Sequence, residues 1–256
     1  MIKRYWLLIV ALLLYCFQAS ADKIILASDY WCPINCEPNS NQEGFMIDIA
    51  RRVFTEQGHQ IEYQLMPWNR TLSMVRSGKI HGAVGPYIDD CPDFIFPKNE
   101  LAMIGFSVYV KKDSSWLYNN ISSLEEIRLG VAANYAYGQE LDLYIEKHKT
   151  DRKRLQINYG NLPVESNIRM LLSDRVDAVV ATQLVFLHIV NKLNVSNQLK
   201  SAGTINKPKK AYIAFSPALQ SSDEYAKILS DGVAELRKSG ELTEILSKYG
   251  LTDWKK

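Results

Sequence analysis

Apolar positions along the chain fall into two alternating patterns, short unbroken runs and longer stretches with helical spacing. In the first third, 45–54 is apolar at 45, 46, 49, 50 and 53, which is the spacing of one face of a helix. Short apolar runs on either side of it predict strands. The predicted strands are 24–27, 61–66 and 82–84, and the predicted helices are 45–54 and 69–75. This alternation is typical of helices packed on a mostly parallel sheet.

A second alternating series follows the polar stretch 111–120. Its predicted strands are 129–132, 155–159 and 178–181, and its predicted helices are 139–147 and 168–172. A last apolar strand at 212–215 precedes a helix at 223–238, whose apolar positions lie on one face. The sequence therefore predicts an α/β protein built from two sets of strands and helices.

The order of these elements predicts two lobes. The simplest topology assigns 22–109 with 211–256 to lobe 1 and 110–210 to lobe 2, so the chain crosses between lobes near Tyr109 and near Lys210. A cleft with a double hinge can close on a ligand. Ligands of α/β units lie beyond the carboxyl ends of the strands, which is where the loops 29–33 and 85–93 are expected to emerge.

The first 21 residues have the layout of an export signal. Lys3 and Arg4 precede an apolar run at 7–15, and Ala19-Ser20-Ala21 offers a site for cleavage after Ala21. A spanning helix needs about 20 apolar residues, and this run is much shorter. A lipid anchor on Cys16 is disfavoured because the bulky Tyr15 stands directly before it. The segment predicts export to the periplasm.

Charge excludes two classes of partner. The chain has 30 Lys and Arg against 28 Asp and Glu, and removal of Lys3 and Arg4 with the signal leaves 28 against 28. A protein that binds nucleic acid or an acidic membrane surface normally has a basic excess. No cofactor or metal is predicted either, because the four histidines are scattered singly, without the Cys or His spacing of a metal site.

Cys32, Cys36 and Cys91 remain after cleavage. Export favours at least one disulfide bond. Cys32 with Cys36 would enclose three residues, whereas Cys91 with either of them would join two distant loops. The sequence leaves these pairings open.

Several short segments appear in an informative order. They are Ile24-Ile25-Leu26-Ala27-Ser28-Asp29, Trp31-Cys32-Pro33, Gly44-Phe45-Met46-Ile47-Asp48-Ile49, Pro67-Trp68 and Ser77-Gly78-Lys79-Ile80. This order resembles the first lobe of the family 3 periplasmic solute-binding proteins, most of which capture amino acids for ABC transporters. The resemblance implies a two-lobed type II periplasmic-binding-protein fold with two hinge strands. It also implies a monomer that binds a small polar molecule and delivers it to an ABC permease in the inner membrane.

The resemblance places two aromatic platforms at the ligand. Trp31 and Trp68 stand where related amino-acid binders often carry such residues. Facing indole rings would bury the apolar part of a ligand and attract a cation. The alternative is that both are core tryptophans.

The usual charged clamp for an amino acid is missing. Family members hold the ligand carboxylate with an arginine in the interval that corresponds to 85–97, and this interval contains no arginine. Asp93 takes that position when it is counted forward from the strand, Asp90 takes it when counted back, and Tyr87 lies nearby. Thr182 replaces the acidic residue that receives the ligand ammonium. The resemblance therefore implies a ligand without the usual zwitterionic head, such as a cation, an amide or a sugar-like molecule.

Three further residues are candidates for ligand contact. Arg70 lies at the start of a predicted helix, where it could bind a carboxylate or remain a solvated surface residue. Tyr135 and Tyr137 fall at the strand-to-helix turn of lobe 2. They could cover the ligand or pack at the hinge.

The leading hypothesis is a non-enzymatic binding protein for uptake of a small polar solute. One alternative is a periplasmic dehydratase-like enzyme on the same scaffold, which needs a general acid in the cleft. Glu165 and His188 are the nearest candidates for that role. The other alternative is a soluble sensor that presents its liganded form to a membrane receptor.

Overall fold

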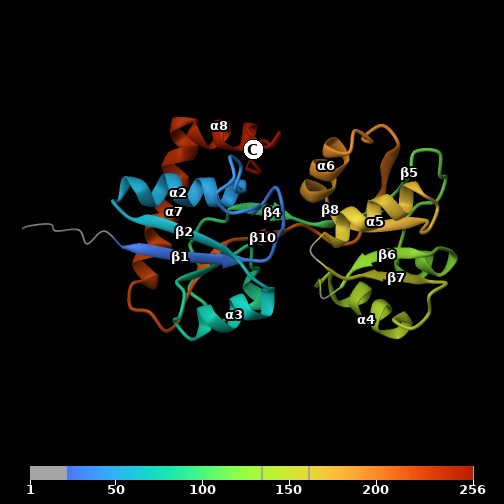
Figure 1. Cartoon of the computed structure of the whole chain (residues 1–256), viewed down its shortest axis with the longest axis horizontal. Helices are drawn as coiled ribbons and strands as arrows, with labels where there is room; N and C mark the ends of the chain where they lie inside the picture. The colour runs from blue at the N-terminus through green and yellow to red at the C-terminus, as the bar shows by residue number, and fades with distance from the viewer. Residues whose placement is uncertain (1–21, 134, 161, 256) are drawn as a thin grey trace, which may run out of the picture.

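The computed structural model describes residues 22–133, 135–160 and 162–255, and Figure 1 shows them as two lobes side by side along the long axis. The predicted signal segment, 1–21, lies outside the described residues. The two lobes contain separate sheets, one of four strands and one of five. This arrangement confirms the predicted α/β class and its two-lobed form.

Lobe 1 is built around the four-stranded sheet, in the order β11-β3-β1-β2. Its first three strands along the chain are parallel, and β11 is antiparallel to β3. The strands are β1 (Lys23–Ser28), β2 (Gln60–Leu65), β3 (Gly82–Val84) and β11 (Ile213–Phe215), and the helices are α2 (Phe45–Glu56), α3 (Trp68–Arg76), α7 (Ser222–Ser239) and α8 (Glu241–Ser247).

Apolar clusters cover both faces of this sheet. On one face Leu26 packs in the same cluster as the buried side of α2, including Phe45, and of α7. On the other face Ala27 packs with residues of α3, and Figure 1 shows α2 and α3 on opposite sides of the strands. A parallel sheet needs this double cover, which explains why β1 is an almost continuous apolar run.

Lobe 2 is built around the five-stranded sheet, in the order β7-β6-β8-β5-β9. β6 is parallel to β7 and β8, whereas β5 is antiparallel to β8 and β9. The strands are β5 (Phe106–Lys111), β6 (Leu129–Ala132), β7 (Leu155–Asn158), β8 (Ala178–Thr182) and β9 (Leu199–Thr204), and the helices are α4 (Gln139–His148), α5 (Pro163–Leu172) and α6 (Gln183–Lys192). Two 3-10 helices, η1 (Ile88–Asp90) and η2 (Ile121–Glu126), lie in loops of the two lobes.

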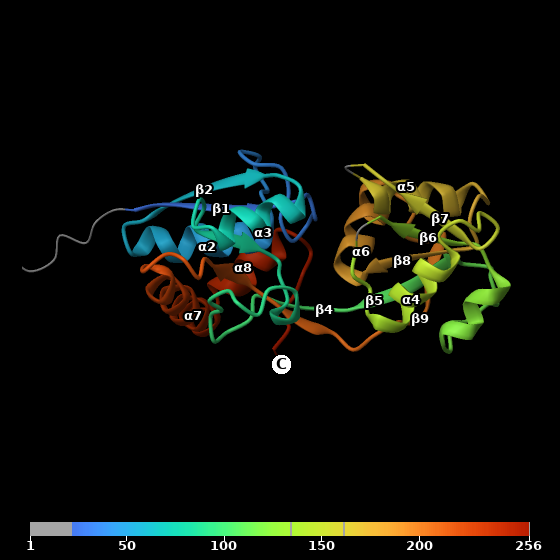
Figure 2. The same ribbon diagram turned by 90° about the horizontal axis from the view of Figure 1, so that it is seen from below.

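Two chain segments connect the lobes, and Figure 2 shows them running together. Before the first crossing, β4 (Ala102–Ile104) pairs with β10 (Lys209–Ala211), which follows the return. β5 already belongs to the lobe 2 sheet at Phe106, so the first crossing is at Gly105, somewhat earlier than the expected Tyr109. A Cβ atom added to Gly105 would lie 3.2 Å from the Cα of Pro208. The two crossing segments therefore pack directly on each other.

Asn206 ties the returning segment to lobe 2. Its Oδ1 accepts a hydrogen bond from the backbone N–H of Phe106 at 3.0 Å, and its Nδ2 donates to the carbonyl of Tyr137 at 2.7 Å. The loop before α4 is thus joined to the start of β5 at the hinge.

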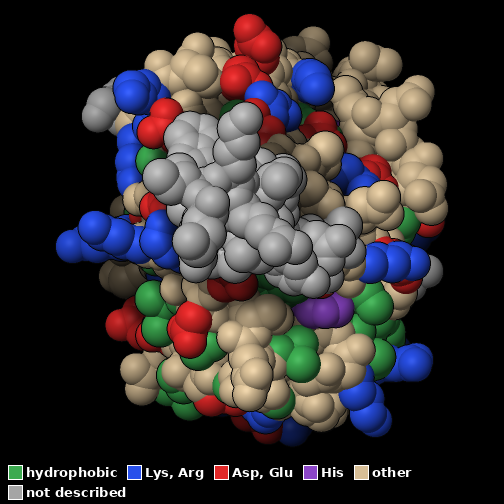
Figure 3. Space-filling view, turned by 90° about the vertical axis from the view of Figure 1, so that its left-hand side faces the viewer, with side chains coloured by type: hydrophobic (Ala, Val, Ile, Leu, Met, Phe, Trp, Pro, Cys, Tyr) green, Lys and Arg blue, Asp and Glu red, His purple; other side chains and the backbone are tan. Residues whose placement is uncertain are grey.

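The surface at the lobe 1 end carries charges of both signs. Figure 3 shows blue basic and red acidic side chains interspersed around the face that it views. Within the part of the chain that the structure describes, no helix is both long and apolar enough to cross a membrane.

Candidate functional site

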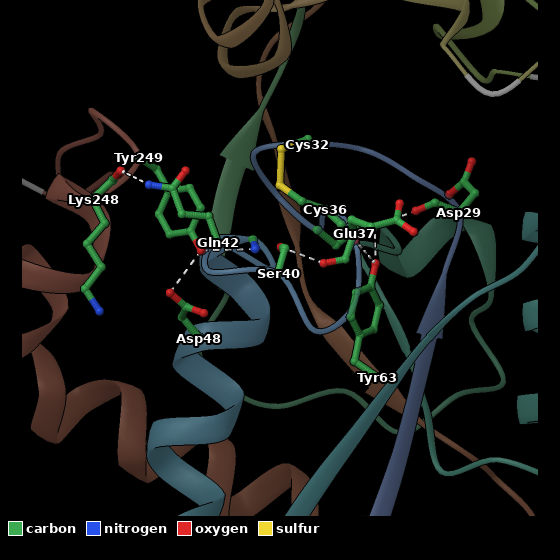
Figure 4. The surroundings of a disulfide bond; sticks show 12 residues. Asp29, Cys32, Cys36, Glu37, Ser40, Gln42, Asp48, Tyr63, Lys248 and Tyr249 are labelled. Carbon is green, nitrogen blue, oxygen red and sulfur yellow. Dashed lines mark hydrogen bonds between the residues drawn. A yellow bond between two sulfur atoms is a disulfide. The ribbon is translucent and has the colours of Figure 1, made fainter. Parts of the chain in front are cut away.

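The loop after β1 carries a disulfide bond between Cys32 and Cys36 (Figure 4). Of the pairings that the sequence left open, this is the one in the structure. Cys91 is a free, fully buried thiol in the cluster beneath α3, and burial raises its pKa to about 12. It therefore acts as a small apolar core residue.

This disulfide loop is seated on the start of α2. The N–H groups of Phe45 and Met46 donate to the carbonyls of Pro33 and Ile34 at 3.0 and 3.1 Å. Gly44 makes the close approach possible, because it has a φ of +109° and an added Cβ would lie 2.4 Å from the Cα of Asn35. The loop thus has a fixed position from which Trp31 projects.

Asp29 lies at the carboxyl end of β1, and Figure 4 shows the disulfide loop between it and α2. The backbone carbonyl of Asp29 accepts a hydrogen bond from Nδ2 of Asn35. The same Nδ2 donates to the hydroxyl of Tyr63 at 3.2 Å, and this hydroxyl donates to the carbonyl of Cys36 at 3.0 Å. Burial raises the pKa of the Asp29 carboxyl to about 6. The site therefore contains an acid whose charge is poorly solvated.

Tyr135 connects this acid to lobe 2. Burial raises the pKa of the Tyr135 phenol, and the negative charge of Asp29 raises it further. The charge of Asp29, in the first loop of lobe 1, thus acts on the turn before α4 in lobe 2.

A pocket with a free volume of about 30 Å³ lies at Tyr135, and Asp29 is not among the residues that line it. We call it the interlobe pocket. Lobe 1 contributes Tyr30, Trp31 and Cys32, and lobe 2 contributes Tyr135, Leu162, Pro163, Val164, Glu165, Val185, His188, Ile189 and Lys192. The mostly apolar lining with a few polar groups is typical of a site for a small molecule. The free volume holds only about two water molecules, so a solute enters only when the lobes separate.

Polar ends of several lining side chains have no internal partner. Within the described residues, the phenols of Tyr30 and Tyr135, the indole N–H of Trp31 and the ring of His188 make no hydrogen bond with the protein. Burial raises the pKa of both phenols and lowers that of His188. These groups are therefore neutral hydrogen-bonding groups that a ligand can use.

Glu165 is the centre of a charged cluster at the lobe 2 wall. Its side chain is only 12% exposed, and its two oxygens lie 2.8 Å from Arg169 and 3.1 Å from Lys192. The hydrogen bond with Arg169 is the largest cause of the lowered pKa of Glu165, and the bond with Lys192 lowers it further. One carboxylate thus lies between two cations, and the cluster has one surplus positive charge.

Of the residues predicted from the sequence, the structure brings Trp31 and Tyr135 together in the interlobe pocket. Trp68 is half-buried at the start of α3 and packs on the apolar cluster that contains Cys91. Arg70 is exposed on the same helix. The structure does not place Trp68 or Arg70 among the residues that line the pocket.

Predicted site residues in 85–97, the interval that contains no arginine, make contacts close to their own positions. An oxygen of Asp90 accepts from the N–H of Tyr87 at 3.2 Å and caps η1. The hydroxyl of Tyr87 is buried without a partner in the described structure. Asp93 pairs with Arg76 at 2.6 Å on the surface. None of these three predicted residues lines the pocket.

The remaining two predicted residues hold lobe 2 together. Tyr137 is buried, its hydroxyl accepts from the N–H of Ala132 at 2.7 Å, and its ring packs edge-on against Phe106 beside the hinge. Of the two roles expected for Tyr137, contact with the ligand and packing at the hinge, the contacts of its side chain correspond to packing. Thr182 is also buried, and its Oγ1 accepts from the N–H of Val185 at 3.4 Å as the N-cap of α6.

Sequence reasoning did not single out Asp29, Tyr30 or Lys192 as candidates. Asp29 and Tyr30 begin the loop 29–33, which was expected at the ligand side because it follows a strand. Lys192 had no local signal, because it lies in the last turn of a helix that only the tertiary fold brings to lobe 1.

Two lobes joined by paired crossing segments, with an aromatic pocket between them, define a binding protein of the kind that closes on its ligand. Residues 24–252 match the model of the bacterial extracellular solute-binding proteins, family 3, and the chain belongs to this family. The family resemblance noted in the sequence is thereby confirmed. A curated relative, the probable histidine-binding protein of Neisseria gonorrhoeae, is 23% identical over 83% of this chain and 76% of its own length.

Solved structures with the same fold include several binding proteins. An ancestral arginine-binding protein bound to arginine has a TM-score of 0.65 and 22% identity, over 89% of this chain and 97% of its own. The amino acid ABC transporter substrate-binding protein AbpA of Streptococcus pneumoniae, bound to L-arginine, has a TM-score of 0.65 and 20% identity, over 89% and 94%. A histidine kinase sensor domain similar to periplasmic binding proteins has a TM-score of 0.68 and 16% identity, over 89% and 95%.

Proposed function

We propose that this protein is exported to the periplasm after cleavage behind Ala21, captures a small cationic solute between its lobes and delivers it to an ABC-type permease. Family membership supports the general role of a solute-binding protein. The arginine of two structural neighbours and the histidine in the name of the curated relative are both amino acids with basic side chains. They make a cationic ligand a reasonable starting point.

The observation that carries the proposal is the position of Asp29. Its carboxyl group is poorly solvated, lies at the carboxyl end of β1 and is close enough to Tyr135 to raise the pKa of that phenol. A cation that enters the cleft would stabilise the Asp29 carboxylate in place of the solvation that burial removes. Hydrogen bonds between a cation and a carboxylate are strong because both partners are charged. The rings of Trp31 and Tyr135 can add cation–π attraction.

The residues at the usual amino-acid clamp agree with this proposal. The interval 85–97 contains no arginine, and Thr182 uses its hydroxyl to cap α6. A ligand held by its α-carboxylate in lobe 1 would therefore lack the bidentate partner that such a group prefers.

The two general-acid candidates of the enzyme alternative have little support. A general acid must hold a proton near neutral pH, but ion pairs with Arg169 and Lys192 lower the pKa of Glu165. The other candidate, His188, has a lowered pKa because it is buried. Neither group is poised as an acid.

The test is a thermal-shift screen of the mature chain, 22–256, with agmatine, putrescine, L-arginine, L-histidine, L-glutamate and glucose as probes. We expect cations to raise the melting temperature, since a ligand that binds only the folded state stabilises it. D29N should lose this shift. The matched control is D174N, which removes an 81% exposed acid paired with Lys111 in lobe 2. Stabilisation by glucose alone, or an undiminished cation shift in D29N, would refute the proposal.

A further inference from the structure

We infer that the interlobe pocket also binds a carboxylate, at its lobe 2 wall, through Lys192, His188 and Tyr30. The solute would then be dipolar, with its cationic group at Asp29 and its anionic group at the opposite wall. This inference rests on the proposed function and names a second recognition site for the same ligand. It places the carboxylate where none of the expected clamp residues lies.

The charge of the lobe 2 wall is the first argument. Glu165 is shared between Lys192 and Arg169, so the three side chains carry one net positive charge. Lys192 lines the pocket, whereas Arg169 does not. An ammonium group has three donors, and the bond of Lys192 to Glu165 at 3.1 Å uses one of them. The surplus charge and the unused donors are therefore on the residue that faces the ligand space.

Unpartnered donors beside this lysine are the second argument. His188 lies one helical turn before Lys192 on α6, so both side chains are on one face of the helix. The ring of His188 and the phenol of Tyr30 have no hydrogen-bond partner within the described residues. Burial is the largest cause of the raised pKa of the Tyr30 phenol. The charge of Lys192 lowers this pKa and the charge of Glu165 raises it, so the phenol is near the cluster. A carboxylate at this point could accept bonds from both lobes.

The start of α5 is the third argument. Pro163, Val164 and Glu165 form its first turn and line the same pocket. The amino end of a helix favours negative charge. The carboxylate of Glu165 supplies negative charge at this helix end, but Arg169 and Lys192 already pair with it. The wall therefore remains electropositive, and an anion bound there would bridge the lobes and favour their closed arrangement.

The test compares two pairs of probes that differ in a carboxylate, L-arginine with agmatine and L-histidine with histamine. Isothermal titration of the mature protein would measure each dissociation constant in the wild type, K192Q, K192R and K111Q. K111Q is the matched control, because it removes a lobe 2 lysine that pairs with Asp174 and does not line the pocket. Melting temperatures without ligand would verify that each variant is folded.

We expect at least one carboxylate-bearing probe to bind wild-type protein about tenfold or more tightly than its decarboxylated partner. K192Q should remove most of that difference, K192R should restore it, and K111Q should retain it. Equal binding of both members of each pair, or an equal loss in K192Q and K111Q, would overturn the carboxylate site and leave the cation site standing. Binding of none of the four probes by wild-type protein would overturn both.

Discussion

Replacement of Asp29 by Asn should stabilise the unliganded protein at neutral pH while it removes cation binding. Burial raises the pKa of this carboxyl from 3.8 to about 6 in the folded state. Each pKa unit corresponds to about 1.4 kcal/mol, so ionised Asp29 costs the fold up to about 3 kcal/mol above both pKa values. Asn has nearly the same size, carries no charge and keeps an oxygen for the hydroxyl of Ser28, which lies 3.5 Å from Asp29.

The sign of the pH dependence follows from this shift. The folded state binds the proton more tightly than the unfolded state, so the free energy of unfolding falls as pH rises from about 4 to about 6. Below that window Asp29 is protonated in both states and contributes no penalty. D29N should match wild type near pH 3.5 and exceed it by up to about 3 kcal/mol at pH 8.

Urea denaturation of wild type, D29N and the D174N control between pH 3.5 and 8 would measure these differences. The wild-type and D29N curves should separate only within the titration window, whereas D174N should run parallel to wild type. If D29N and wild type instead ran parallel across the whole range, Asp29 would not be a desolvated acid. The cation proposal would then lose its main support.

Three further predictions concern the same site and its frame. Agmatine should bind the wild type about tenfold more tightly at pH 7 than at pH 5, because Asp29 loses its proton with a pKa of about 6; titration in two buffers would show proton release, and a flat affinity would contradict it. Y137F should lower the free energy of unfolding by about 1 to 3 kcal/mol, since the buried N–H of Ala132 loses its partner, yet leave probe affinity unchanged; a selective loss of affinity would instead make Tyr137 a ligand contact. G44A should cost about 2 to 4 kcal/mol through its positive φ and the clash with Asn35, and unaltered urea melting would disprove that close packing.

The alternation of apolar runs and helical faces predicted most elements of both lobes, because a sheet covered on both sides leaves a strong local signal. Strands 82–84 and 129–132 have the same bounds in the structure. The helix α6 was not predicted, since its segment is apolar on nearly every side and has no polar face to reveal the helical period. The first crossing was placed at Tyr109 rather than Gly105 because 102–110 is apolar apart from Gly105 and Ser107, so β4 and β5 look like one strand in the sequence.

The candidate site was harder to predict than the fold. The family resemblance predicted Trp31 as an aromatic platform, and the structure places it in the pocket. Asp93 has an equally plausible position in the sequence, but its partner Arg76 lies 17 residues away on α3. Lys192 reaches the pocket only because α6 packs beside α5 within lobe 2, where Lys192 pairs with Glu165. Sequence spacing within one segment contains no information about such contacts.

Trp31 projects from a pinned loop of lobe 1 and shares the pocket with Tyr135 of lobe 2. Asn206 joins the loop that carries Tyr135 to the hinge, so this loop should move with lobe 2 as a unit. The indole of Trp31 lies at the boundary between the lobes, so the polarity of its surroundings changes whenever the lobes separate or approach. The protein therefore contains its own optical probe of domain motion, and tryptophan emission could follow ligand capture in real time without any attached dye.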